Sequence, residues 1–388
     1  MFSSFNSSLT SRYRRLNMNF KNIHMRHFII FSLIFTLLFL ISFIGKRNHI
    51  LQVKFTNQTT DATKEAMKPK SANLSVCQQN SGKELLILVW VWPFDQPFPL
   101  DRCEKDFNIT GCKLTADRGL YDTADAVIMH YAEIIGNRNS LPQKPRHRFQ
   151  HWVWFNVEPP FIATKLNDLD NLFNMTMTFR KDSDIFVPYG HMQILKEIQN
   201  FTIPPKSKLV SWAVSKWYPG VPRIAYYNEL KKYIQIDIYG KGNKPLSSED
   251  FTKTISQYKF YLAFENSIYT DYITEKIWTN AFDSWAVPVV LGTPRKNYEQ
   301  FIPGDAFIHV DDFSSHKELA DYLLMLDKDD EKYKKYFNWR SYYKPILHTG
   351  WPILHNGWPY YYCTACRVLK NAPEYQVIPS IEKWYLEQ

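Results

Sequence analysis

Uninterrupted apolar runs alternate with helix-patterned segments along most of the chain. The first run after a long polar stretch is 85–91 (LLILVWV), which is typical of a strand buried on both faces of a parallel sheet. Similar runs predict strands at 113–115, 126–130, 152–156, 209–214, 234–239, 258–264, 287–291 and 306–310. Helices are expected at 225–233, 272–282 and 317–326. Strands that alternate with helices predict an α/β fold of doubly wound, Rossmann-type sheets.

The strand and helix pattern starts again after a Pro-Pro pair at 204–205. We therefore expect two α/β domains that face a cleft, at 84–205 and 206–388, and we find no internal repeat. The chain has 388 residues, which agrees with two or three domains. Its 45% hydrophobic and 22% charged residues are those of a globular protein, so disorder is excluded for most of the length.

An uncharged apolar stretch at 28–45 is just long enough to span a bilayer. A cleaved signal peptide is the alternative, but 42–45 (SFIG) is a poor cleavage site. Five basic residues precede the stretch, so the positive-inside rule places 1–27 in the cytosol and the rest in a lumen. We expect a single-pass type II protein with a transmembrane signal anchor. The polar segment 46–83 reads as a stem.

The formal net charge of +9 comes almost entirely from the N-terminal segment. Residues 1–54 contain eight basic side chains and no acidic one, so the other residues carry only 9 − 8 = +1. A nearly neutral body argues against a nucleic-acid partner.

The sequons and cysteines fit a luminal body. N-glycosylation sequons occur at Asn57, Asn73, Asn108, Asn174 and Asn200. The five cysteines are Cys77, Cys103, Cys112, Cys363 and Cys366. A zinc site formed by the last four is an alternative, but the spacing between 103 and 112 is wrong for a zinc ribbon. We expect two disulfides that attach the C-terminal tail to the first domain, with Cys77 unpaired and available for a homodimer.

The segment 264–276 (FENSIYTDYITEK) carries the most chemical information. It follows a predicted strand and begins a predicted helix, where ligands bind in parallel α/β sheets. Asp271 is expected to be the helix N-cap, and the helix N-terminus with Lys276 suits a phosphate. Glu275 offers two oxygens for a ribose diol. The alternative is a capped helix that faces solvent.

This segment, together with VPVVLG at 287–292, resembles the signature of the α1,3-fucosyltransferases, glycosyltransferase family 10. The resemblance covers about 84–386 and looks strongest toward the fucosyltransferase 9 branch. It continues through 89–96 (VWVWPFDQ), 107–121 (FNITGCKLTADRGLY), 152–160 (WVWFNVEPP), 180–190 (RKDSDIFVPYG), 212–217 (WAVSKW), 226–234 (YYNELKKYI) and 336–340 (YFNWR).

The resemblance implies a GT-B fold and transfer of L-fucose from GDP-fucose, with inversion, to the GlcNAc of N-acetyllactosamine-type glycans in the Golgi. Glu158 matches the family's catalytic carboxylate, and Gln96 matches an acceptor-binding position. The implied disulfides are Cys103–Cys363 and Cys112–Cys366. The positions that match donor-binding residues are Tyr189, Ser215, Arg223, Tyr261, Asn266, Tyr272, Glu275 and Lys276. A catalytically silent luminal glycan-binding protein is the alternative.

The resemblance implies no cofactor, and a divalent metal is expected at most to stimulate. Asp182-Ser-Asp184 has the DxD pattern that holds manganese in glycosyltransferases of the other major fold, but the matching family segment is not known as a metal site. Lys216 stands where the most similar branch carries Asn, and 353–362 is an insert without a recognised counterpart. These two departures leave the donor affinity and the acceptor unassigned.

Overall fold

A computed structural model describes residues 84–387 except 241, 349–356 and 373–374. The predicted anchor, the stem, Cys77 and the sequons at Asn57 and Asn73 lie outside the described residues. Within the described part, no helix combines the length and apolarity that a membrane span requires.

The first lobe is built on a six-stranded parallel sheet in the order β2-β1-β3-β4-β5-β6. Its central strands are mainly apolar and largely buried, as expected for a parallel sheet covered on both faces. The strands are β1 (Leu85–Val89), β2 (Cys112–Thr115), β3 (Ala126–His130), β4 (His151–Asn156), β5 (Met175–Thr178) and β6 (Ile185–Phe186). The helices between them are η1 (Pro93–Asp95), α2 (Arg102–Phe107), η2 (Arg118–Thr123), α3 (Tyr131–Ile134), η3 (Arg138–Ser140) and η4 (Leu166–Leu169).

The second lobe is built on a five-stranded parallel sheet in the order β12-β11-β10-β8-β9. Its strands are β8 (Lys208–Ala213), β9 (Asp237–Tyr239), β10 (Tyr258–Phe264), β11 (Val287–Leu291) and β12 (Ile308–His309). Its helices are α4 (Pro222–Leu230), α5 (Ser248–Ile255), η5 (Lys276–Asp283), α6 (Arg295–Tyr298), η6 (Val310–Asp312), α7 (His316–Lys328), α8 (Asp330–Lys335) and η7 (Asn338–Ser341).

Helices cover both faces of the second sheet. Side chains of α4 and α7 form one apolar cluster with alternate residues of β8, β10 and β11. The opposite residues of β10 pack with α5 and η5 in the larger cluster that also contains the first-lobe core. Alternating faces of the same strands are therefore buried against different helices, which makes the sheet doubly wound.

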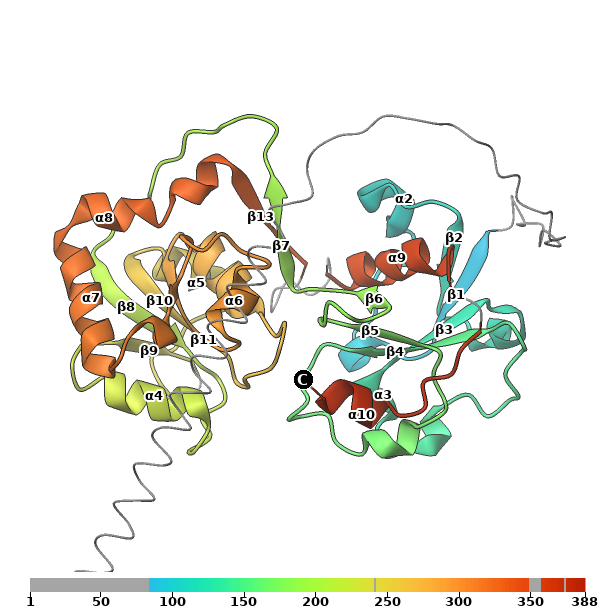
Figure 1. Cartoon of the computed structure of the whole chain (residues 1–388). Coiled ribbons are helices and arrows are strands. Elements are labelled where there is room, and N and C mark those ends of the chain that lie inside the picture. The colour runs from blue at the N-terminus through green and yellow to red at the C-terminus, as the bar shows by residue number, and fades with distance from the viewer. Residues whose placement is uncertain (1–83, 241, 349–356, 373–374, 388) are drawn as a thin grey trace, which may run out of the picture. The chain divides into compact units, whose positions relative to one another are not determined.

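The C-terminal residues return to the first lobe. Helix α9 (Gly357–Leu369) lies beside α2 (Figure 1), and α10 (Ile381–Leu386) contacts η4. Two disulfides with the expected pairing, Cys103–Cys363 and Cys112–Cys366, attach α9 to the first lobe. A two-stranded antiparallel ladder of β7 (Gly190–Ile194) and β13 (Tyr343–Leu347) joins two segments that lie about 150 residues apart in the sequence.

The start of the helix predicted at 272–282 was wrong. The π-helix η5 begins at Lys276 and Glu275 precedes it in helical conformation, whereas residues 272–274 are not helical. Asp271 has φ +63° and is not the N-cap: its carboxylate accepts the Lys181 N–H at 2.9 Å and the Asn297 Nδ2–H at 2.7 Å. The buried Glu265 accepts the Thr274 N–H at 2.9 Å, which holds the chain in a loop where the sequence pattern suggested a first helical turn.

Candidate functional site

A cavity of about 290 Å³ lies at the carboxyl ends of strands from both sheets. It is lined by Phe94, Val157, Glu158, Tyr189, Ser215, Lys216, Arg223, Asn266, Tyr272, Glu275, Lys276 and Trp358. Strand ends of parallel sheets are where ligands bind in α/β proteins. The structure thus brings together the predicted catalytic carboxylate and seven of the eight predicted donor-binding residues.

The remaining two predicted site residues do not line this cavity. Tyr261 is fully buried in β10, and its hydroxyl accepts a hydrogen bond from Asn280 Nδ2 at 3.1 Å. Tyr261 is therefore a core residue of β10 that packs beneath the cavity residues. Gln96 is exposed and lies two residues after Phe94, which does line the cavity.

The Glu158 backbone is fixed by three neighbours. Its N–H donates to Asn156 Oδ1 at 2.9 Å, and the Tyr385 hydroxyl donates to its carbonyl oxygen. The Tyr189 hydroxyl donates to the preceding carbonyl, that of Val157, at 2.6 Å. The Glu158 carboxylate itself makes no hydrogen bond or ion pair within the described residues. A rigid backbone with an uncommitted carboxylate at a cavity wall is the arrangement that a general base requires.

The pKa of Glu158 is raised, chiefly by burial and secondarily by the negative charge of Glu275. Lys216, Lys276 and His130 oppose this shift electrostatically, with Lys216 the largest of the three influences. A carboxylate whose pKa lies above its ordinary value is a stronger base, provided that it stays ionised.

Lys276 is the centre of a buried charge cluster on the second-lobe side. Its Nζ lies 2.9 Å from Glu265 Oε2 and 3.0 Å from Glu275 Oε1, and it donates to Thr274 Oγ1 at 2.7 Å. Burial raises the pKa of Glu265, whereas the Lys276 ammonium lowers it. Lys276 is therefore a counter-ion within the protein, in addition to any ligand role.

Three polar atoms of the cavity residues lack partners. Arg223 Nε, Asn266 Oδ1 and Trp358 Nε1 are buried without a hydrogen bond in the described structure. Arg223 Nη2 donates to the Lys216 carbonyl at 2.8 Å, which orients the guanidinium. Buried donors and acceptors without partners are rare, so these atoms indicate a polar or anionic ligand.

The first-lobe side of the cavity has an unusual backbone. Phe94 has φ +52°, which is uncommon for a residue with a Cβ, and its N–H donates to Glu133 Oε1 at 2.8 Å. Glu133 in turn lies 2.6 Å from His130 Nδ1. This chain of contacts holds the turn that carries both Phe94 and Gln96. A strained backbone at a cavity wall agrees with a binding role.

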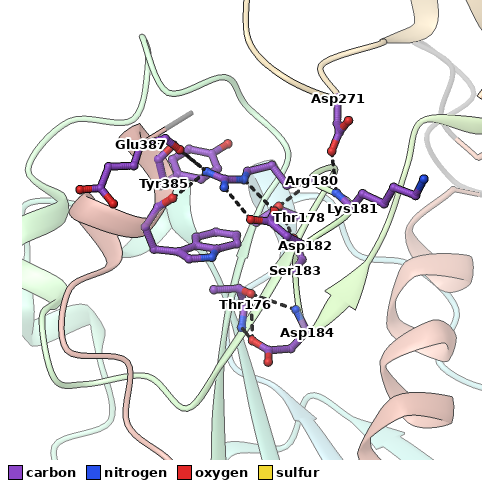
Figure 2. A network of polar contacts seen from close by, with 11 residues as sticks. Thr176, Thr178, Arg180, Lys181, Asp182, Ser183, Asp184, Asp271, Tyr385 and Glu387 are labelled. Carbon is purple, nitrogen blue, oxygen red and sulfur yellow. Dashed lines mark hydrogen bonds and ion pairs between the residues drawn. The ribbon is translucent and has the colours of Figure 1, made fainter. Parts of the chain in front are cut away.

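Asp182 and Asp184 do not form a shared metal site. Figure 2 shows Asp182 paired with Arg180, at 2.6 Å between Oδ2 and Nη2, while Asp184 accepts hydrogen bonds from the Thr176 N–H and hydroxyl. Arg180 Nη1 also donates to the carbonyls of Trp384 and Glu387, which secures the end of α10. Among the described residues, no cluster of three metal-ligating side chains exists.

The sequons in the described region differ in accessibility. Asn108 and Asn200 are exposed. Asn174 is fully buried: its Oδ1 accepts hydrogen bonds from the Trp152 N–H and from Arg146, and its Nδ2 donates to the Gln376 carbonyl. A glycan on Asn174 requires these contacts to break, so the structure speaks against this site.

Sequence reasoning missed Phe94, Val157 and Trp358 as cavity residues, and noted Lys216 only as a departure from related sequences. Phe94 and Val157 lie inside the motifs 89–96 and 152–160, which also contain the predicted site residues Gln96 and Glu158. Their proximity to those residues could have indicated that they line the same site. Trp358 lies in α9, and the disulfides bring that helix to the first lobe from the far end of the chain. The sequence marked its segment, 353–362, only as an insert.

Comparison with known proteins assigns the family. Residues 82–190 match "Fucosyltransferase, N-terminal" and residues 203–384 match "Glycosyltransferase family 10 (fucosyltransferase) C-term". The chain belongs to the glycosyltransferase family 10 fucosyltransferases and is by family an enzyme.

Three curated relatives illustrate the similarity. The 3-galactosyl-N-acetylglucosaminide 4-alpha-L-fucosyltransferase FUT3 of Bos taurus is 48% identical, with 78% of this chain and 82% of the relative covered. The 4-galactosyl-N-acetylglucosaminide 3-alpha-L-fucosyltransferase FUT6 of Homo sapiens is 46% identical over 77% and 82%. The 4-galactosyl-N-acetylglucosaminide 3-alpha-L-fucosyltransferase 9 of Mus musculus is 43% identical over 87% and 92%. These values support the family without selecting a branch.

Solved structures of the same kind are also similar. "Crystal Structure of alpha1,3-Fucosyltransferase with GDP-fucose" matches with a TM-score of 0.47 and 19% identity, covering 81% of this chain and 96% of that one. "Crystal Structure of alpha1,3-Fucosyltransferase with GDP" matches with a TM-score of 0.46 and 18% identity, over 79% and 95%.

Proposed function

We propose that this protein transfers L-fucose from GDP-fucose, with inversion at the fucose anomeric carbon, to the 3-hydroxyl of GlcNAc in N-acetyllactosamine-type glycans. The observation that carries the proposal is the uncommitted Glu158 carboxylate in a cavity that also contains the buried, partly unpaired Arg223 and Asn266. The names of the relatives, which are α1,3- and α1,4-fucosyltransferases of galactosyl-GlcNAc chains, support the substrate class.

Glu158 acts as the general base. As the acceptor oxygen forms its bond to the fucose carbon, the carboxylate takes the hydroxyl proton. The bond between that carbon and the diphosphate oxygen breaks, and GDP leaves with the electron pair. A hydroxyl is far too weak an acid to ionise at neutral pH, so the proton must move during the attack.

The Arg223 guanidinium is the natural counter-charge for the diphosphate, because guanidinium groups bind phosphate oxygens in pairs. Ser215, Asn266, Tyr272 and Glu275 supply polar groups around the nucleotide sugar. The proposed function implies a GT-B-like arrangement, in which the second lobe binds the donor and the first lobe binds the acceptor. The first-lobe wall, which includes Phe94 and Trp358, is the place for the acceptor sugar.

Transfer from GDP-fucose to free N-acetyllactosamine, with the linkage and anomeric configuration read by NMR, tests the proposal. An α1,3-linked fucose on GlcNAc supports it. The alternative, a catalytically silent glycan-binding protein, predicts acceptor binding with no fucose transferred under any condition. A product of the opposite anomeric configuration contradicts the inverting mechanism.

We also propose a Golgi membrane location, with the luminal body held by the anchor at 28–45, and a homodimer through Cys77. Both rest on the sequence pattern. In sealed microsomes, the body should resist added protease. After detergent has opened the membranes, endoglycosidase should shift the mobility of the chain. Non-reducing electrophoresis should show a dimer that Cys77→Ser abolishes. Protease cleavage of the body, or a dimer that survives Cys77→Ser, contradicts the respective proposal.

A further inference from the structure

Lys216 is a cavity residue whose ammonium group makes no hydrogen bond or ion pair with the described part of the chain. It follows β8 and is exposed, and its side chain lines the same cavity as Glu158. Its carbonyl oxygen accepts the 2.8 Å hydrogen bond from Arg223 Nη2. A buried guanidinium therefore fixes the Lys216 backbone, while the ammonium remains available to the cavity.

The other cationic groups that face Glu158 already have partners. Lys276 is held by two carboxylates at 2.9 and 3.0 Å, and His130 Nδ1 lies 2.6 Å from a Glu133 oxygen. The Lys216 ammonium has no such partner within the described residues, and it is the largest electrostatic influence that lowers the pKa of Glu158.

The surroundings of Glu158 otherwise favour the protonated carboxyl. Burial raises its pKa, and the Glu275 carboxylate raises it further; Lys216 is foremost among the charges that lower it. The aromatic hydroxyls around it contribute no positive charge, and burial raises the pKa of each: Tyr189, Tyr272 and Tyr385. A bound diphosphate would add negative charge to this cavity, which increases the need for a compensating cation.

We propose that Lys216 is a positioning residue that keeps Glu158 ionised in the donor-bound enzyme, so that the base is ready when the acceptor arrives. The inference rests on the proposed function.

The pH dependence of transfer tests the proposal. Removing the Lys216 charge should raise the pKa of Glu158. As the pH is lowered, Glu158 is then protonated earlier, so the acid limb of the pH–rate profile moves to higher pH. For Lys216→Gln we expect the acid limb of kcat/KM for the acceptor, at saturating GDP-fucose, to shift up by roughly 0.5–1 pH unit. Below the limb, this corresponds to a loss of roughly three- to tenfold, with a smaller change on the alkaline plateau.

Two further variants control the experiment. Lys216→Arg retains the charge and should restore the parent profile. Lys253→Gln removes an exposed positive charge from α5, outside the cavity, and should leave the limb unchanged. GDP binding and the melting temperature show that each variant is folded.

The outcomes separate the inference from the proposed function. If the parent chain transfers no fucose to any acceptor, the proposed function fails. If the parent transfers fucose but the acid limb of Lys216→Gln stays in place, only the role of Lys216 is overturned. An equal shift in Lys253→Gln also overturns it, because the effect is then one of net charge. The role of Lys216 is also overturned if Lys216→Arg shows the same shifted acid limb as Lys216→Gln.

Discussion

Lys276 neutralises a fully buried carboxylate, so its removal should destabilise the protein as well as weaken donor binding. The Lys276 side chain is 15% exposed and that of Glu265 only 1%. Replacing the lysine by methionine keeps most of its volume but leaves Glu265 without a counter-ion.

The structure sets the size of the expected loss. Breaking a buried ion pair by removing one partner costs about 3–5 kcal/mol. Glu265 keeps the hydrogen bonds from the Thr274 N–H and hydroxyl, both 2.9 Å long, so we expect about 3 kcal/mol at pH 7. Without Lys276, the pKa of Glu265 rises further above its unfolded value. The variant should therefore be close to the parent below pH ~4.3 and lose stability as the pH increases.

Chemical denaturation followed by tryptophan fluorescence at pH 5 and pH 7, with GDP titration of the folded variants, measures both effects. The double variant Glu265→Gln/Lys276→Met should recover most of the stability at pH 7 without recovering GDP affinity. Lys317→Met is the matched control, because its pair with Asp321 is exposed and screened by solvent, so this variant should keep the stability of the parent. A Lys276→Met variant within ~1 kcal/mol of the parent at pH 7, or a double variant without recovery, would refute the reasoning.

Two further predictions concern the attachment of the C-terminal residues. Replacing Cys103 and Cys363 by serine leaves Cys112–Cys366 to close the large loop and opens only the short ring between the two disulfides, so the chain should lose about 3 kcal/mol of stability; non-reducing thermal unfolding measures the loss, and an unchanged melting temperature contradicts it. Arg180→Lys removes the forked contact with Asp182 and weakens the hold on the α10 carbonyls, at a cost of about 1–3 kcal/mol. Hydrogen exchange should then accelerate in α10 before the rest of the first lobe, and uniform protection in the variant would count against the contact.

The central strands could be predicted because both faces of each strand are buried. Segments such as 126–129 and 287–291 are continuously apolar, and the structure has strands at those positions. The β7–β13 ladder could not be predicted in this way. Its strands are half-exposed, one contains a proline, and each is stabilised by a partner about 150 residues away.

The candidate site was predictable where its residues lie in one local motif. Glu158, Glu275 and Lys276 belong to such segments, and the structure places all three at the cavity. The role of Asp271 was not predictable, because an Asp before a helical pattern resembles an N-cap, whereas tertiary contacts with Lys181 and Asn297 determine its conformation.

The measurement that tests the central claim most directly is the rate of fucose transfer by Glu158→Gln. The amide keeps the shape of the side chain and cannot take the acceptor proton. Positioned general bases contribute about 10²–10⁴-fold, so kcat should fall by that factor while GDP binds with the parent's affinity. A folded Glu158→Gln variant that transfers fucose within about threefold of the parent rate would contradict the assignment of Glu158 as the base.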